Sequence, residues 1–280
     1  MALYYDEVFE DSVRFGVKVK ETLHSEQSEF QKVEVIDTTR FGRMLVIDGI
    51  FMTSERDEFF YHEMLVQPAM CTVAEPKSVL IIGGGDGGSA REVLRHAEVE
   101  RCLMIEIDEA VVRVSKEWLP TIGRAWNDPR LEVRFANGVA FVKESESRAF
   151  DVILVDGSDP VGPAEVLFSK EFFEGCRRLL KPGGVLALQS ESPIYFRDTF
   201  DQTQRRLMDA FEVVRPYFGP VPTYSAGIWS WTFCSDSVDP LKPLDARVEA
   251  MTTDSKLYNG DIHRAAFALP NYLRRTTTSG

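Results

Sequence analysis

Two patterns of hydrophobic residues divide the chain into a short β-rich segment and a longer segment that alternates between strands and helices. Up to about residue 54, apolar residues alternate with polar ones, as at Phe15, Val17 and Val19, and glycine-containing turns separate the runs. A period of two is typical of half-buried strands. The pattern predicts a small antiparallel sheet with strands at 14–24, 29–37, 43–47 and 50–53.

The pattern changes after residue 54, where apolar residues at helical spacing predict a helix over 58–70. Short apolar runs then predict strands at 78–82, 101–105, 131–135, 152–155, 184–189, 213–217 and 228–234. Amphipathic segments predict helices at 89–96, 109–118, 139–144, 169–180 and 197–211, and Pro182-Gly183-Gly184 is expected to end the helix before it. This alternation favours an α/β fold with a mostly parallel, doubly wound sheet. We therefore expect an N-terminal β-sheet domain, 1–54, and a larger α/β domain, 55–280.

Composition is that of an ordinary folded protein, with 44% hydrophobic residues and no apolar run near the roughly 20 residues of a membrane span. The acidic N-terminus shows no secretory signal. Cys71, Cys102, Cys176 and Cys234 are scattered without a C-x-x-C pair, which is typical of reduced thiols. We expect a cytoplasmic protein with no membrane partner.

The net charge is −12, from 32 basic and 44 acidic residues. Nucleic-acid binding calls for a basic face, so the charge argues against such a partner. An acidic protein can concentrate a small cationic substrate, although solubility alone also explains the excess of acids.

A glycine loop, Gly83-Gly84-Gly85-Asp86-Gly87-Gly88, follows the first strand of the α/β part and precedes a helix. Gly83, Gly85 and Gly88 satisfy the G-x-G-x-x-G spacing, which lets a ligand approach the backbone closely. Glu106 ends the second strand about 20 residues later, where an acid can bind ribose hydroxyls. The glycine loop and Glu106 together predict a ligand that contains adenosine. They do not distinguish NAD from an S-adenosyl compound.

Asp86 is unusual inside such a loop. Its carboxylate would repel a pyrophosphate seated on the helix N-terminus and also the carboxylate of intact S-adenosylmethionine. It would attract an ammonium group. The alternative is that Asp86 only caps the following helix.

A third acid, Asp156, ends the buried strand that begins near Phe150 and runs into the acidic turn containing Asp159. Carboxyl ends of parallel strands meet at one crevice, so Asp156 is expected beside Asp86 and Glu106. Converging carboxylates repel one another unless a cation lies between them. The alternative is ordinary turn chemistry, because aspartate is common in turns.

The ordered motifs resemble the spermidine synthase family from about Gly16 to Tyr272. They are Gln27–Gln31, Leu45–Gly49, Glu55–Met64, Ile81–Gly88, Glu106–Asp108, Asp156–Pro163, Pro222–Tyr224 and Tyr258–Pro270. The glycine loop alone is a weak signal, whereas the ordered set is specific. The resemblance implies an N-terminal β domain on a Rossmann-like, methyltransferase-type domain, assembled as a homodimer or homotetramer.

The resemblance also implies an aminopropyltransferase, in which decarboxylated S-adenosylmethionine is a co-substrate and no cofactor or metal is needed. The aminopropyl group would pass to putrescine, giving spermidine and methylthioadenosine. A protonated diamine cannot attack, and with a pKa near 10.4 its deprotonation at pH 7 costs roughly 4–5 kcal/mol. A carboxylate can take the proton, and the sulfonium leaves as a neutral thioether, so orientation supplies most of the catalysis.

Site roles carried over from the family fall into three groups. Asp156 would accept the proton of the attacking amine. The nucleoside side would be bound by Gln31, Asp86, Glu106, Asn137, Gly138 and Pro163, with Asp86 holding the aminopropyl ammonium. The diamine side would be bound by Tyr61, His62, Asp86, Asp156, Asp159 and Tyr224, with Gln189 a weaker candidate. Trp229 and Trp231 are interpreted as packing residues that could lie near this pocket. Asn137 stands where many members have aspartate, and its amide oxygen can still accept a hydrogen bond from adenine.

Several alternatives stay open at this point. His62 on an apolar helix can be an ordinary core histidine, and Tyr61 an ordinary core aromatic. The glycine loop also suits an NAD-dependent oxidoreductase or an S-adenosylmethionine methyltransferase, and a non-catalytic binding module is a further class. Cadaverine, agmatine and spermidine are alternative acceptors, because pocket shape decides among them.

Overall fold

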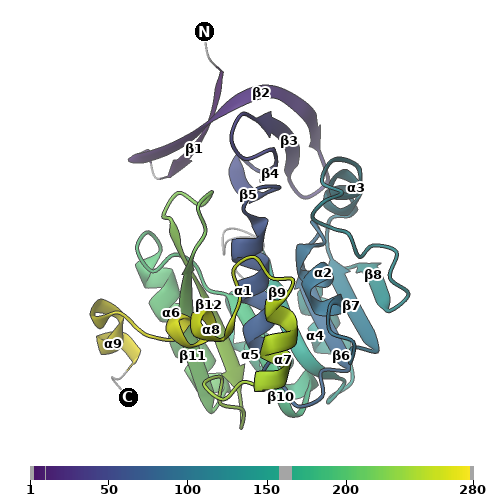
Figure 1. Ribbon diagram of the computed structural model, residues 1–280, viewed down its shortest axis with the longest axis vertical. Coiled ribbons are helices and arrows are strands. Elements are labelled where there is room, and N and C mark those ends of the chain that lie inside the picture. Colours follow the sequence, from purple (N-terminus) through teal and green to yellow (C-terminus); the bar gives the residue numbers. More distant parts are fainter. Residues whose placement is uncertain (1–2, 10, 158–165, 278–280) are drawn as a thin grey trace.

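Two β-sheets, one above the other, organise the chain (Figure 1). The structure is a computed structural model that describes residues 3–9, 11–157 and 166–277. Within these residues the upper sheet has five strands and the lower sheet has seven. The strands of the upper sheet come from the first 54 residues, and helix α1 (Glu58–Met70) leads from it to the lower sheet.

The N-terminal sheet is an antiparallel meander in the order of the chain. Its strands are β1 (Tyr4–Phe9), β2 (Val13–Gln27), β3 (Lys32–Thr38), β4 (Arg43–Ile47) and β5 (Ile50–Ser54). The sequence pattern did not predict β1, because this strand reverses the usual alternation. Tyr4 and Val8 are exposed, whereas Glu7 is buried and accepts a hydrogen bond from the Phe51 amide at 2.9 Å.

The lower sheet is mostly parallel, as the alternation of strands and helices predicted. Its strands are β6 (Ser78–Gly83), β7 (Arg101–Glu106), β8 (Leu131–Phe135), β9 (Phe150–Asp156), β10 (Leu180–Gln189), β11 (Val213–Pro220) and β12 (Ile228–Ser235). They lie in the order β11-β12-β10-β9-β6-β7-β8. The last two form a hairpin that runs antiparallel to β10 through β12.

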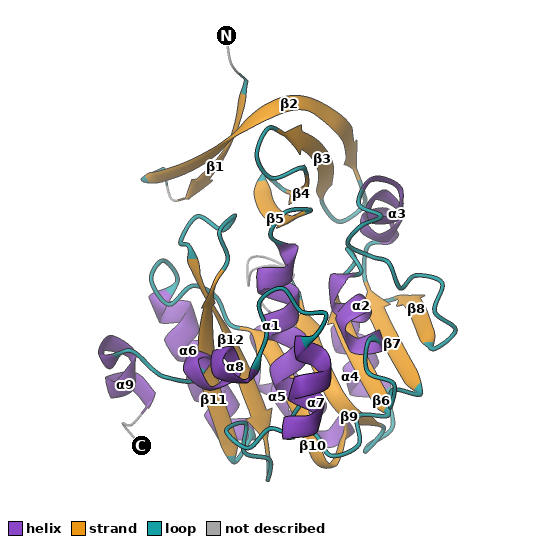
Figure 2. Ribbon diagram, in the orientation of Figure 1, coloured by secondary structure: helices purple, strands orange, loops and turns teal. Residues whose placement is uncertain are grey.

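Helices cover both faces of this sheet (Figure 2). The helices of the described residues are α1, α2 (Gly88–Leu94), α3 (Glu109–Trp118), α4 (Gly138–Glu144), α5 (Lys170–Leu179), α6 (Arg197–Ala210), α7 (Asp245–Thr252), α8 (Gly260–Ala266) and α9 (Asn271–Thr277). Among them, α3 lies beside β3 of the upper sheet, and α9 lies to one side of the lower sheet. The last three helices were not predicted, since a short helix such as α7 buries only Val248 and shows no apolar stripe. The fold class is confirmed: a doubly wound α/β domain preceded by a small antiparallel sheet.

The prediction that Pro182-Gly183-Gly184 ends a helix was wrong. Helix α5 ends at Leu179, and Pro182-Gly183-Gly184 lies inside β10 instead of ending the helix. The pairing of β10 with β9 shifts register between Leu180 and Val185, so these residues form an irregularity at the start of the strand. Gly183 has a φ of 76°, which glycine adopts without strain.

The central strands are apolar on both sides, because each face carries helices. Val79 and Ile81 of β6 face the cluster that contains α1 and α2. Leu80 and Ile82 face the opposite cluster, which contains Phe172 and Phe173 of α5. This explains why the strands read as continuous apolar runs in the sequence.

Helix α1 is buried almost all round, because eleven of its thirteen residues are buried. Its polar residues therefore need internal partners. Glu63, for example, accepts hydrogen bonds from the backbone amides of Lys256, Leu257 and Tyr258 at 2.7–2.8 Å. The same helix carries Glu58, Tyr61 and His62 into the interior near its first turns.

Buried contacts also fix the upper sheet on the lower domain. Val33 and Val35 of β3 pack with Val111 and Val114 of α3. Asp57, just before α1, accepts hydrogen bonds from the amide and the hydroxyl of Thr223 at 2.9 and 3.0 Å. In the described part of the chain, no helix has the length and apolar character needed to cross a membrane.

Candidate active site

The candidate site forms where β6, β7 and β9 end. The last residue of β6, Gly83, pairs with Asp156, the last residue of β9. Gly83 has a φ of 84°, and a Cβ on it would come within 2.2 Å of the Asp156 carbonyl oxygen. Only glycine lets the two strands end this close together. The Gly84 amide then donates a hydrogen bond to that carbonyl at 2.9 Å.

His62, Asp86 and Asp156 form the centre of the site, with one polar atom of each within 4.8 Å of the others. The His62 ring is 2% exposed. Its Nδ1 lies 2.8 Å from Glu58 Oε2, and its Nε2 lies 3.2 Å from Asp86 Oδ2. Burial alone would lower the pKa of His62, but the carboxylates of Asp86 and Glu58 outweigh burial and hold it well above its usual value. A carboxylate oxygen beside each ring nitrogen thus favours the doubly protonated, cationic form of His62.

Asp156 is held by two neighbouring hydroxyl groups. Ser89 donates to Asp156 Oδ2 at 2.6 Å, and the hydroxyl of Tyr61 forms a second hydrogen bond with the same carboxylate. Burial raises the pKa of Asp156, Asp86 raises it further, and the His62 cation opposes both. A carboxyl group with a raised pKa is a better proton acceptor than an exposed one.

Aromatic side chains lie beside this carboxylate. The rings of Tyr61 and Tyr224 are 6.0 Å apart between centroids, and Trp229 meets Tyr224 edge-on at 4.6 Å. The hydroxyl of Tyr224 donates to the Met52 carbonyl at 3.0 Å, which ties the β11–β12 turn to the N-terminal sheet. Such rings can contact the apolar chain and the charged end of an alkyl amine.

Glu106 lies on the other side of the glycine loop, at the end of β7. Burial raises its pKa to about 7, with smaller effects from the charges of Asp108 and Asp156. The Asp108 amide donates to Glu106 Oε1 at 3.0 Å, and the Asp108 side chain accepts from Gln31 at 3.0 Å. The structure thus brings Gln31 and Glu106 to the same edge of the sheet.

Asn137 and Gly138 lie where α4 begins, beyond the end of β8. The Asn137 side-chain oxygen accepts the amides of Val139 and Ala140 at 2.9 and 3.1 Å, so it caps the helix. Both lone pairs of that oxygen are used. An adenine amino group would therefore compete with the cap for this acceptor.

Two of the predicted residues, Asp159 and Pro163, lie outside the described residues. Gln189 is at the end of β10, where its amide donates to the Gly157 carbonyl at 3.4 Å and to Glu191 at 3.1 Å. It therefore links β10 to the residue that follows Asp156.

Sequence reasoning missed four residues that hold the site together, namely Glu58, Ser89, Arg91 and Asp108. Glu58 and His62 are four residues apart on a predicted helix, so their contact was detectable from spacing. Arg91 donates to the same Glu58 oxygen at 2.8 Å, but it comes from another helix. No local pattern indicates that contact.

The central cluster has ligand types that a metal ion can use, since it combines an imidazole with two carboxylates. However, a protonated imidazole has no lone pair for a metal. With His62 as a cation, the negative charge of Asp86 and Asp156 suits an ammonium group better.

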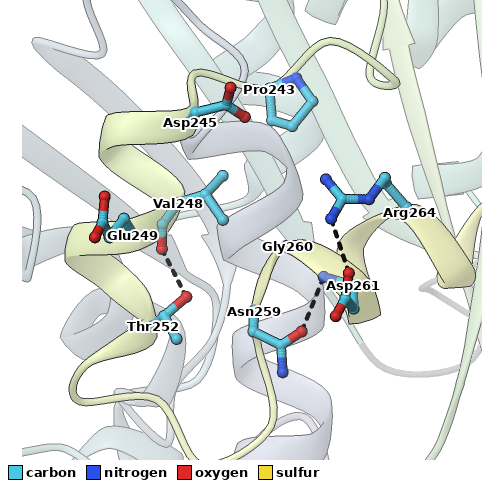
Figure 3. A pocket seen from close by; sticks show the side chains of 9 residues that line it. All are labelled: Pro243, Asp245, Val248, Glu249, Thr252, Asn259, Gly260, Asp261 and Arg264. Atoms are coloured by element: carbon cyan, nitrogen blue, oxygen red, sulfur yellow. Dashed lines mark hydrogen bonds and ion pairs between the residues drawn. The ribbon is translucent and has the colours of Figure 1, made fainter.

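Two surface grooves lie away from this cluster. One, of about 320 Å³, runs between α7 and α8 (Figure 3). Its Arg264 pairs with Asp261 at 2.8 Å, and the Asn259 side chain caps α8, so these polar groups already have partners. The other, of about 860 Å³, is lined by residues such as Arg148 and Lys181 near the start of β10. Neither contains a residue of the cluster.

Comparison with known proteins agrees with this geometry. Residues 58–243 match the spermine/spermidine synthase domain, and residues 3–55 match the spermidine synthase tetramerisation domain. A polyamine aminopropyltransferase from Thermoanaerobacter sp. (strain X514) is 42% identical over 98% of both chains. One from Prochlorococcus marinus (strain MIT 9313) is 46% identical over 95% of this chain and 94% of its own.

Solved structures show the same fold. A spermidine synthase in complex with the transition-state analogue AdoDATO superimposes with a TM-score of 0.95 at 38% identity, covering 98% of this chain and 94% of its own. The spermidine synthase from Thermotoga maritima gives a TM-score of 0.92 at 37% identity, with the same coverage. The chain belongs to the spermine/spermidine synthase family and is an aminopropyltransferase.

Gly88 gives a direct test of the site geometry. A Cβ at this position would lie 2.3 Å from the His62 ring, so Gly88→Ala must displace the imidazole. A shift of about 1 Å in a site group can cost on the order of 100-fold in rate. We expect aminopropyl transfer to fall by roughly that factor in steady-state assays.

Gly260→Ala is the matched control, because the nearest atom to its added Cβ is 3.5 Å away and outside the site. It should keep wild-type activity. Wild-type rates in Gly88→Ala would show that the position of His62 does not matter.

Proposed function

We propose that this enzyme transfers the aminopropyl group of decarboxylated S-adenosylmethionine to putrescine, giving spermidine and methylthioadenosine. The observation that carries the proposal is the contact set of Asp156. It is a carboxyl group of raised pKa that lies beside Asp86 and forms hydrogen bonds with the hydroxyls of Ser89 and Tyr61. This arrangement suits a group that binds an ammonium and then removes its proton.

The reaction needs one proton transfer and one displacement. Asp156 takes a proton from the attacking ammonium, which leaves a nitrogen lone pair. That nitrogen forms a bond to the aminopropyl carbon next to sulfur, and the carbon–sulfur bond breaks with its electrons going to sulfur. The sulfonium becomes a neutral thioether, so the leaving group needs no acid and we propose no metal or cofactor.

Different carboxylates would bind different parts of the two substrates. Glu106 would accept the ribose hydroxyls, and Gln31 lies on the same side through Asp108. Asp86 would hold the aminopropyl ammonium between the two substrates. The carboxylate of intact S-adenosylmethionine would meet Asp86 as a like charge, which favours the decarboxylated compound over a methyl donor.

The acceptor amine would lie against Tyr61 and Tyr224, with its attacking nitrogen at Asp156. Putrescine is our choice because the two solved structures compared above are spermidine synthases. Asp159 and Pro163, outside the described residues, are proposed for the diamine and the adenine. Cadaverine, agmatine and spermidine are the competing acceptors.

We further propose a homo-oligomer, a dimer or a tetramer, built through the N-terminal sheet. The match of residues 3–55 to a tetramerisation domain supports this, as do the exposed side chains of Leu3, Tyr4 and Phe30. The four free, buried cysteines support a cytoplasmic location, where thiols stay reduced.

An amine panel tests the acceptor. We expect the purified protein, given decarboxylated S-adenosylmethionine, to convert putrescine to spermidine faster than it uses cadaverine, agmatine or spermidine, with one methylthioadenosine per product. Mass spectrometry of the products decides. A faster reaction with another amine would replace putrescine in the proposal, and no product from any amine would end it.

Asp156→Asn tests the proton acceptor, because an amide cannot take the proton. General-base groups contribute on the order of 10²- to 10⁴-fold, so single-turnover transfer should slow by that amount. Asp151→Asn is the control on the same strand, since Asp151 pairs with Lys181 at the other end of β9. If Asp156→Asn stays within a few-fold of wild type, the base is another group.

Glu106 gives a pH test on the nucleoside side. Its pKa of about 7 means that the acceptor form, the carboxylate, gains population as pH rises through neutrality. Methylthioadenosine should therefore bind about tenfold more tightly at about pH 8 than at about pH 6. Calorimetric titration measures this, and Glu106→Gln should remove the dependence. Equal affinity at the two pH values would separate Glu106 from nucleoside binding.

A further inference from the structure

His62 is the last cation in a row of alternating charges that begins on α2. Arg95 pairs with Glu92 at 2.5 Å, and Glu92 pairs with Arg91 at 3.0 Å. The row then continues through Glu58 and His62 to Asp86, with contacts of 2.8, 2.8 and 3.2 Å. Each member is partly or fully buried, so each charge depends on the next one for compensation.

The geometry at His62 defines its protonation state. Both ring nitrogens face a carboxylate oxygen, Nδ1 towards Glu58 and Nε2 towards Asp86. A neutral imidazole has only one N–H, so one nitrogen would present a lone pair to a carboxylate. The doubly protonated ring donates to both. Glu58 is essential to this state because it supplies one of the two acceptors.

Glu58 is itself fixed as an anion. Burial would raise its pKa, but His62 and Arg91 outweigh burial and lower the pKa to about 2. One oxygen, Oε2, accepts from both His62 and Arg91, and Arg91 is anchored to the Ile122 carbonyl at 2.9 Å. Two donors thus hold the Glu58 carboxylate against the ring.

We propose that Glu58 is a positioning residue for aminopropyl transfer, which keeps His62 as a doubly donating cation and thereby orients Asp86 and keeps Asp156 ionised. Glu58 does not touch the reacting atoms in this account. The inference rests on the proposed role of Asp156 as the base.

Loss of the Glu58 charge has a defined effect on pH dependence. The charged or titratable groups around His62 are Glu58 and Tyr61 on α1, Arg91 on α2, Asp86 in the glycine loop and Asp156 on β9. Without Glu58, His62 loses an acceptor and becomes neutral more readily. The cation that opposes protonation of Asp156 is then lost, so the Asp156 pKa rises. Asp156 must be ionised to work, and the acidic limb of the activity profile should move to higher pH.

Glu58→Gln is the test variant. We expect kcat/KM for the amine at neutral pH to fall on the order of tenfold, with the acidic limb displaced to higher pH. The affinity for methylthioadenosine, which lacks the aminopropyl ammonium assigned to Asp86, should change by less than about twofold, since Glu58 contacts His62 and Arg91. Glu58→Asp restores the charge and should recover part of the loss and of the limb position.

Glu63→Gln is the matched control, because Glu63 is a buried acid on the same helix whose oxygens bind backbone amides away from the site. It should lower the melting temperature and leave the acidic limb in place. If the acidic limb of the activity profile moved equally in Glu58→Gln and Glu63→Gln, both acids would act only through the stability of the fold. That result would contradict a specific role for Glu58.

Nitrogen NMR of histidine gives a second readout that needs no activity. The chain has four histidines, so His62→Gln identifies the signal of His62. At neutral pH the wild-type ring should show two protonated nitrogens, and the ring in Glu58→Gln should show one. This measurement also decides the matter if Glu58→Gln folds poorly, because a singly protonated ring in the wild type overturns the proposal.

The outcomes separate this inference from the proposed function. A wild type that transfers nothing to any amine refutes the proposed function, while the NMR result still tests Glu58. A wild type that is active and dependent on Asp156, together with an unmoved acidic limb in Glu58→Gln, refutes the role of Glu58 alone.

Discussion

A buried imidazole between two carboxylates sets the conditions that the rest of the site has to meet. His62 contacts Glu58 on its own helix and Asp86 in the glycine loop. The ring leaves no space for a side chain at Gly88, where α2 starts. The ring is held by the buried helix α1 on one side and by Asp86 of the loop on the other, and it leaves room only for a residue without Cβ at position 88.

This interaction also decides the charge that the site offers to a ligand. Among the described residues, the four carboxylates of Glu92, Glu58, Asp86 and Asp156 face three cations, Arg95, Arg91 and His62. One negative charge is left over at the end of the sheet, beside aromatic rings. An ammonium group can neutralise it, whereas a phosphate or a carboxylate would add to it. Membership of the spermine/spermidine synthase family and the electrostatics of the cluster thus lead to the same class of substrate.

The sequence predicted the parts of the structure in which local pattern and burial agree. The bounds of α1 were predicted correctly, and so was the mostly parallel sheet, because its strands are apolar on both faces. Strand β1 was not predicted, because it buries Glu7 and exposes Val8. Helix α7 was not predicted either, because Val248 is its only buried residue and its sequence has no periodic apolar stripe.

In the site, too, the sequence predicted the features that local pattern determines and missed those that depend on packing. Asp86, Glu106 and Asp156 could be placed together in advance because each ends a strand or follows one in a parallel sheet. The contact of Arg91 with Glu58 could not, since two helices distant in sequence supply it and only their packing brings them together. The protonation state of His62 was equally hidden, because it depends on two acceptors from different segments.

The central claim is that the cluster around Asp86 recognises a ligand by positive charge and rejects a neighbouring negative one. The most direct measurement is the affinity of the protein for decarboxylated and for intact S-adenosylmethionine under the same conditions of pH and salt. The two ligands differ only by the carboxylate that would face Asp86. The account predicts clearly tighter binding of the decarboxylated compound, with the difference reduced in Asp86→Asn. Equal affinities in the wild-type protein would contradict it.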